Sequence, residues 1–177
     1  ATCHVTELCV RIIIESGILP KGALQLVCGG IGDMLSRLIS QDVVSFTGSA
    51  STAIHLRSQL HLIENSIRFI AEQDSLNASI LGPDVALGSP EFNLFAKEVK
   101  SEMITKAGQK CTAIRRIFVS QAHLDQMIET LKTKLASTVI GDPRLNETDM
   151  GALVSKAQKR DVLEKASLIG QQAERVF

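Results

Sequence analysis

One cysteine has the surroundings of a possible nucleophile. Cys111 ends the sequence G-Q-K-C at 108–111, after an expected long helix and just before an expected strand. A thiolate is the strongest common side-chain nucleophile, and a neighbouring cation such as Lys110 would help to form it. The alternative is a small buried apolar residue, the commonest fate of an unpaired cysteine. The local sequence by itself favours that alternative.

A carboxylate at the end of an expected strand is a second candidate. Glu72 follows the apolar stretch 67–71. If it were partly removed from water, a carboxylate there could serve as a general base. The alternative is an ordinary surface carboxylate in a loop, and the isolated segment favours it.

The sequence F-T-G-S at 46–49 could bind a phosphate. Thr47, Gly48 and Ser49 follow a β-branched stretch and precede an expected helix. The free N–H groups at a helix start attract anions, and the Ser49 hydroxyl could add a donor. The alternative is that Ser49 or Ser51 simply caps the helix, which is the commoner role of such residues. The turn G-G-I-G at 29–32 is weaker evidence, because it lacks the third glycine of the dinucleotide-binding fingerprint.

The other cysteines and the histidines give no metal-binding pattern. Cys3, Cys9 and Cys28 fall on apolar helix faces or in an expected strand, so we expect them in the core. The sequence contains neither C-x-x-C nor H-x-x-x-H, so we expect no metal.

Composition narrows the classes of partner. The 177 residues are 45% hydrophobic, and Lys+Arg 19 balance Asp+Glu 19, so no overall charge attracts nucleic acid or an anionic membrane. Only 3% are aromatic, which argues against stacking on single-stranded nucleic acid. The apolar runs are too short to cross a bilayer, and we expect a cytoplasmic protein with reduced thiols. The chain begins at Ala1 and ends in a helical pattern, so we expect a piece of a longer protein.

The hydrophobic periodicity predicts an α/β fold. Helices and strands alternate in the first part, which is typical of a parallel sheet with helices on its faces. A boundary between two parts is expected near residues 74–90. The expected helices are 2–16, 33–39, 50–60, 91–106, 123–135 and 155–169, the last capped by Ser155, and the expected strands are 24–28, 43–46, 67–71, 78–81 and 114–119.

Taken in order, these segments resemble the aldehyde dehydrogenase superfamily. F-T-G-S at 46–49 is similar to its cofactor loop, and G-Q-K-C at 108–111 to its nucleophile motif. Glu72 stands where the family has its general base. The segments G-I-L-P-K-G at 17–22, G-D-P at 141–143 and M-G-A-L-V-S at 150–155 are similar to further family signatures.

Two departures point to one branch of the family. Ala53 replaces the last glycine of the cofactor motif, and E-Q-D-S at 72–75 replaces the usual E-L-G-G. With the segment 106–116, this pattern resembles the CoA-thioester semialdehyde dehydrogenases of phenylacetate and benzoate breakdown.

The resemblance implies a fold and a reaction. Residues 1–73 would form the C-terminal part of a Rossmann-like NAD(P)-binding domain, and residues 74–177 the start of an α/β catalytic domain. Cys111 would attack the aldehyde, Glu72 would help water to release the acid, and Thr47, Gly48 and Ser49 would bind NADP or NAD, with NADP suggested by the branch. The substrate would be a CoA-linked aldehyde and the full-length enzyme a homo-oligomer.

The same resemblance places other parts of the site outside this chain. A side-chain Asn for the oxyanion and a ribose-binding Lys would precede Ala1, and the motif E-x-F-G-P would follow Phe177, so we expect the chain alone to be inactive. Two other functions stay open: a non-catalytic nucleotide-binding module with the same fold, and a cysteine acyltransferase.

Overall fold

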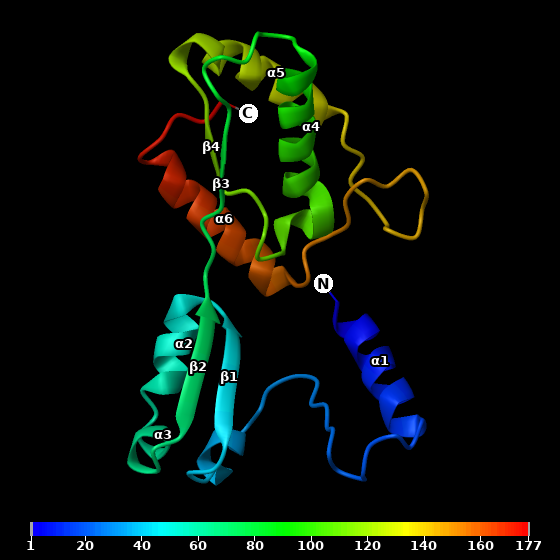
Figure 1. The fold of residues 1–177 in the computed structure, drawn as a ribbon, viewed down its shortest axis with the longest axis vertical. Helices are drawn as coiled ribbons and strands as arrows, with labels where there is room; N and C mark the ends of the chain where they lie inside the picture. The colour runs from blue at the N-terminus through cyan, green and yellow to red at the C-terminus, as the bar shows by residue number, and fades with distance from the viewer. Residues whose placement is uncertain (1, 177) are drawn as a thin grey trace. The chain divides into compact units, whose positions relative to one another are not determined.

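The computed structural model describes residues 2–176, which fall into two units (Figure 1). The N-terminal unit is Thr2–Asp74, and the C-terminal unit begins at Ser75. Each unit contains a two-stranded parallel sheet accompanied by helices. The expectation of an α/β fold with parallel strands is therefore confirmed.

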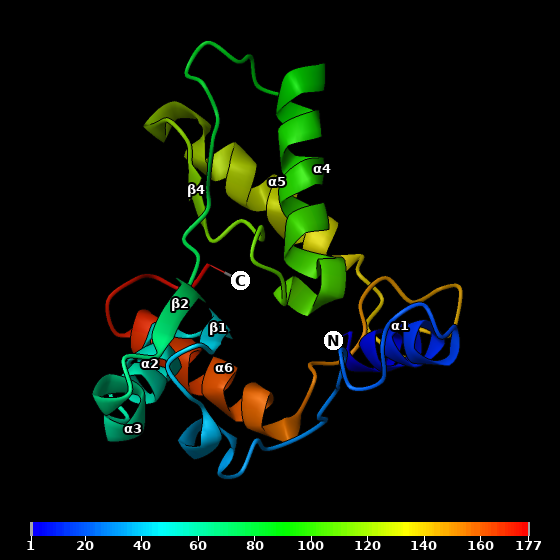
Figure 2. The same ribbon diagram turned by 60° about the horizontal axis from the view of Figure 1, so that its bottom comes forward.

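The N-terminal unit is organised around a parallel pair of strands. α2 packs on both strands, and α2 and α3 form the crossover that makes the strands parallel (Figure 2). The strands pair from Val43 opposite Arg68 to Gly48 opposite Gln73, so their carboxyl ends lie together. The elements are α1 (Cys3–Glu15), η1 (Met34–Arg37), β1 (Val43–Gly48), α2 (Ala50–Arg57), α3 (Leu60–Glu64) and β2 (Arg68–Gln73).

The C-terminal unit has its core between a short parallel sheet and two helices. β3 pairs with β4, and α4 packs against α5. Leu81, Phe92, Ala96 and Met127 are the buried centre of this core. The elements are β3 (Ala78–Ile80), α4 (Pro90–Ile104), η2 (Thr105–Gly108), β4 (Arg116–Phe118), η3 (Gln121–His123), α5 (Leu124–Ala136) and α6 (Lys156–Gly170).

Capping residues explain where two of these helices begin. The Ser89 side chain accepts a hydrogen bond from the Phe92 N–H, and Pro90 occupies the first turn of α4. The Ser155 hydroxyl accepts from the Gln158 N–H at the start of α6, which confirms the expected cap.

Some sequence expectations are wrong. Residues 24–28 form no strand, and the side chains of Leu26 and Val27 are exposed. A strand needs a neighbour for its backbone groups, and this segment pairs with none of the described strands. The expected helix 50–60 is interrupted at Ser58 and Gln59, which end α2 and precede α3.

The expected burial of three cysteines is also wrong. Cys3, Cys9 and Cys28 are exposed, as is Cys111. α1 forms as expected, but none of its residues is buried, so its apolar stripe is uncovered in this chain. Among residues 2–176, no helix combines the length and the apolar character needed to span a bilayer.

We expect Phe92 to be the most sensitive core position of α4. Its side chain is 1% exposed, and Phe92→Ala should lower the free energy of unfolding by about 3–5 kcal/mol, through lost burial and the cavity it leaves. Chemical denaturation followed by circular dichroism would measure this loss. Leu94→Ala is the matched control, because Leu94 lies on the same helix and is 56% exposed. Equal losses in the two variants would contradict this account of the core.

Candidate functional site

The carboxyl ends of β1 and β2 bring four of the candidate residues together. Thr47 lies directly opposite Glu72 in the strand register, and Gly48 lies opposite Gln73. The pairing continues for one more hydrogen bond, in which the Asp74 N–H donates to the Gly48 carbonyl at 3.0 Å. In α/β sheets ligands bind at the carboxyl ends of strands, so this edge is a reasonable place for a binding site.

Ser49 caps the helix that follows this edge. Its hydroxyl oxygen accepts a hydrogen bond from the Thr52 N–H at 3.2 Å. The same hydroxyl contacts the hydroxyls of Ser51 and Thr52. The capping role that the local sequence favoured is therefore present, and Ser49 is oriented by it.

An anionic oxygen already lies at the start of α2. The Asp74 carboxylate accepts a hydrogen bond from the Ala50 N–H at 3.1 Å. Asp74 has a φ of 54°, in the left-handed region where glycine is favoured. This contact shows that the helix start accepts a negatively charged oxygen, which is the chemistry a phosphate would require.

Gly48 leaves room for the ring of Phe46 beside the turn from β1 into α2. A Cβ built on Gly48 would lie 2.5 Å from the ring of Phe46. The strand can therefore turn into the helix only with a residue that lacks a side chain, unless the Phe46 ring moves. Glu72, on the neighbouring strand, is exposed, so this unit by itself does not remove its carboxylate from water.

Cys111 lies on an irregular loop between η2 and β4. The residues that lead into this loop, Lys106, Ala107 and Gly108, all have positive φ, of 53°, 53° and 70°. The left-handed conformation costs a residue other than glycine roughly 1–2 kcal/mol, so the loop needs compensating contacts. The Cys111 side chain is exposed, so the alternative of a buried apolar residue is wrong.

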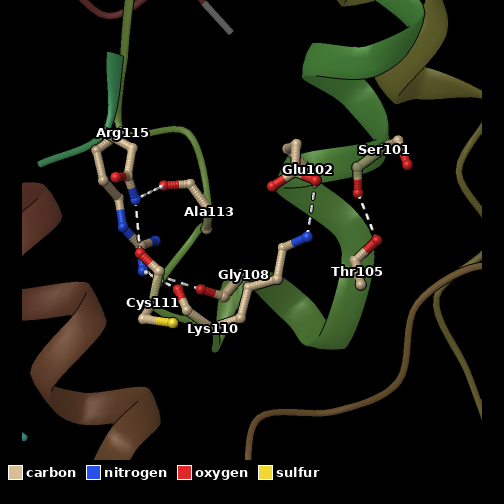
Figure 3. A network of polar contacts seen from close by, with 9 residues as sticks. Ser101, Glu102, Thr105, Gly108, Lys110, Cys111, Ala113 and Arg115 are labelled. Atoms are coloured by element: carbon tan, nitrogen blue, oxygen red, sulfur yellow. Dashed lines mark hydrogen bonds and ion pairs between the residues drawn. The ribbon is translucent and has the colours of Figure 1, made fainter. Parts of the chain in front are cut away.

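Lys110 does not act as the cation expected beside the Cys111 thiol. Its ammonium forms an ion pair with Glu102 on α4, with 2.8 Å between Lys110 Nζ and Glu102 Oε1 (Figure 3). The two side chains are only 18% and 28% exposed, so the pair is poorly screened by water. Lys110 therefore ties the loop to α4, and its charge is already compensated.

Two side chains hold the backbone on either side of Cys111. Arg115 Nη2 donates to the carbonyls of Gly108 at 3.0 Å and Lys110 at 3.3 Å (Figure 3). Asn77 Nδ2 donates to the carbonyls of Cys111 at 2.5 Å and Ala113 at 3.2 Å. These bonds fix the backbone on both sides of Cys111, and at the start of the loop Gln109 Nε2 donates to the carbonyl of the left-handed residue Lys106 at 2.8 Å.

One downstream signature contacts the same loop. The Val154 N–H donates to Gln109 Oε1 at 3.0 Å, which joins the segment 150–155 to the residue two before Cys111. Within the turn at 141–143, the guanidinium and the backbone N–H of Arg144 lower the pKa of the Asp142 carboxyl below its ordinary value. The segments 108–111, 141–143 and 150–155 therefore all lie in the C-terminal unit.

The structure groups the predicted residues into two sets. Thr47, Gly48, Ser49 and Glu72 lie in the N-terminal unit, and Cys111 lies in the C-terminal unit. Sequence reasoning missed the contacts of Asp74, Asn77 and Arg115. The one available signal was that Asp74 falls in the E-Q-D-S segment at 72–75 and Arg115 in the segment 106–116, which resemble one branch of the family. Residues 2–176 contain no cluster of three or more His, Cys, Asp or Glu that could hold a metal ion.

Comparison with known proteins gives consistent matches over the chain. The model of the Aldehyde dehydrogenase family matches residues 1–176. The 3,4-dehydroadipyl-CoA semialdehyde dehydrogenase of Aromatoleum evansii is 43% identical over 176 residues, covering 99% of this chain and 34% of that protein. Aldehyde dehydrogenase family 7 member A1 of Brassica napus is 29% identical over 178 residues, with coverage of 99% and 34%. The chain spans about a third of the length of these curated relatives.

Solved structures share the fold. A double mutant of betaine aldehyde dehydrogenase from Staphylococcus aureus, solved in complex with NAD+, superposes with a TM-score of 0.81 at 24% identity, covering 95% of this chain and 33% of that one. A mutant of proline utilization A from Bradyrhizobium japonicum superposes with a TM-score of 0.80 at 28% identity, covering 98% and 18%. The first of these matches supports the fold alone.

Proposed function

We propose that this chain, which belongs to the aldehyde dehydrogenase family, supplies the nucleophile, the general base and part of the cofactor site of an enzyme. That enzyme oxidises an aldehyde to an acid. The observation that carries the proposal is Cys111: an exposed thiol on a loop whose flanking backbone is held by side-chain hydrogen bonds. A nucleophile must be both accessible and fixed in direction, and this residue meets both conditions.

Cys111 carries the covalent chemistry in this proposal. Its thiolate adds to the carbonyl carbon, and the aldehyde oxygen becomes a negatively charged thiohemiacetal oxygen. The backbone N–H of Cys111 donates a hydrogen bond to that oxygen and stabilises it. Thr47, Gly48 and Ser49 would hold the nicotinamide cofactor, and the chemistry it would supply is acceptance of the hydride from that carbon. The sulfur then holds the acyl group as a thioester.

Glu72 releases the product. Its carboxylate takes a proton from a water molecule as that water attacks the thioester carbonyl. The carbon–sulfur bond breaks, the acid leaves and the Cys111 thiolate is restored. This role assigns to Glu72 a step that is distinct from the oxidation itself.

The cofactor site is assigned to Thr47, Gly48 and Ser49. In support, the Ala50 N–H at the start of α2 donates to a carboxylate oxygen, so this helix end attracts anions such as the pyrophosphate of NADP or NAD, and Gly48 leaves the preceding turn without a side chain. Residues 1–73 would then belong to the cofactor domain and residues 74–177 to the catalytic domain. The enzyme would be cytoplasmic and homo-oligomeric.

The substrate class follows from the branch of the family. The relative from Aromatoleum evansii is named for a CoA-linked semialdehyde. We propose a CoA-linked semialdehyde from aromatic catabolism for the enzyme that contains this chain. The test compares the rate of nicotinamide reduction with a CoA-linked semialdehyde and with the same aldehyde lacking CoA. A higher kcat/KM for the CoA form supports the assignment, and equal values contradict it.

The chain alone should have little activity. It spans about a third of the length of its curated relatives, and removal of a single oxyanion donor already lowers rates by about 10²–10³-fold in other enzymes. We therefore expect the purified 177-residue chain to show no aldehyde-dependent nicotinamide reduction above background. Turnover close to that of the full-length enzyme would contradict this expectation.

A further inference from the structure

The peptide groups on both sides of Cys111 are held at their carbonyl oxygens. The carbonyl of Lys110 and the N–H of Cys111 belong to one planar trans peptide, so they point in opposite directions. Arg115 Nη2 donates to that carbonyl at 3.3 Å and to the Gly108 carbonyl at 3.0 Å (Figure 3). Fixing the carbonyl therefore fixes the direction in which the Cys111 N–H points.

The next peptide is held in the same way. Asn77 Nδ2 donates to the carbonyl of Cys111 at 2.5 Å, and also to the carbonyl of Ala113 at 3.2 Å. With both flanking peptide planes fixed, the two soft dihedral angles of Cys111 have little freedom left.

The two holding residues are themselves joined. The backbone N–H groups of Arg115 and Arg116 both donate to the Asn77 carbonyl, at 2.9 Å and 3.1 Å. Asn77 immediately precedes β3, and Arg115 immediately precedes β4, the parallel neighbour of β3. The support for the Cys111 loop is therefore built on the starts of two paired strands rather than on another loop.

We infer that Arg115 and Asn77 are positioning residues, which orient the Cys111 backbone N–H toward the oxygen that becomes negatively charged when the thiolate adds to an aldehyde. The inference rests on the function proposed above. Arginine suits this role because its planar group presents several donors in fixed directions and can hold two carbonyls at once. Neither residue contacts the substrate in this account.

The test uses two reactions of the same sulfur in the full-length enzyme. Alkylation of Cys111 by iodoacetamide displaces iodide from carbon and creates no oxyanion, whereas addition to an aldehyde does. Arg115→Met should therefore lower kcat for aldehyde oxidation by about 10–10²-fold, while the rate of Cys111 alkylation stays at the parental value. KM for the aldehyde should change little, because the lost interaction acts mainly in the transition state.

Further variants keep the test decisive. Asn77→Ser should show the same separation of the two rates, and Arg115→Lys a smaller loss of kcat, because lysine keeps the charge without the planar arrangement of donors. If Arg115→Met does not fold, these two variants decide the question. Arg144→Met is the control, because Arg144 is an exposed arginine that pairs with Asp142, and it should keep the parental kcat.

Two outcomes would overturn the positioning role, and a third would overturn the proposed function. Parental kcat in the Arg115 and Asn77 variants overturns the positioning role. Equal loss of alkylation and oxidation also overturns it, because that pattern means general disruption of the loop. If alkylation of Cys111 in the parental enzyme leaves aldehyde oxidation intact, the proposed function itself is wrong.

Discussion

Replacing Cys111 by alanine is expected to lower kcat for aldehyde oxidation by at least about 10⁴-fold in the full-length enzyme, as loss of the nucleophile does in other covalent mechanisms. The reason is that the Cys111 sulfur forms the covalent intermediate in the proposed mechanism. Steady-state nicotinamide reduction would measure the loss. The variant should keep its fold, because the Cys111 side chain is exposed and the hydrogen bonds at this residue involve its backbone carbonyl.

The other cysteines provide matched controls. Cys3, Cys9 and Cys28 are exposed in this chain as Cys111 is, so accessibility alone does not distinguish them. Cys9→Ala should keep full activity, and a thiol-specific reagent should modify Cys111 faster than the other three. Equal and slow modification of all four would favour the non-catalytic nucleotide-binding module. Aldehyde oxidation retained in the Cys111→Ala variant would remove the assignment of the nucleophile.

Replacing Glu72 by glutamine is expected to separate oxidation from release of the acid. Glutamine cannot take a proton from water, so hydrolysis of the thioester should slow by about 10²–10⁴-fold. The first round of nicotinamide reduction does not need this base. A rapid burst of about one reduced cofactor per active site, followed by a slow steady state, is therefore the expected signature in a stopped-flow measurement.

A neighbouring carboxylate serves as the control for Glu72. Glu64 ends α3 in the same unit and is also exposed, so Glu64→Gln should leave both phases at parental values. If the burst disappears together with the steady state in Glu72→Gln, then Glu72 acts earlier than proposed. If both phases stay parental, Glu72 is not the general base.

Much of the fold was predictable because its signals are local. The helices at α1, α4, α5 and α6 were expected from amphipathic spacing and capping residues, and each is present. The strand expected at 24–28 was wrong because strand formation depends on a partner, which local sequence does not reveal. The expected burial of Cys3, Cys9 and Cys28 was wrong for a related reason. An apolar face is buried only where another element covers it.

The candidate site was predictable only in part. Sequence motifs were enough to name Cys111, Glu72 and the residues 47–49 as candidates. Aldehyde oxidation requires particular residue types for its nucleophile, its base and its cofactor site. The roles of Lys110, Asn77 and Arg115 could not, because they depend on which carbonyl or carboxylate each side chain reaches after folding. A lysine next to a cysteine suggests a stabilised thiolate, yet its partner here is Glu102.

The most direct test of the central claim is to identify the atom that carries the acyl group. The Glu72→Gln variant of the full-length enzyme would be mixed with aldehyde and cofactor, quenched in acid, digested and measured by mass spectrometry. We expect the peptide containing Cys111 to gain the mass of the acyl group. An acyl group on another cysteine, or a cofactor burst without any acylated cysteine, would contradict it.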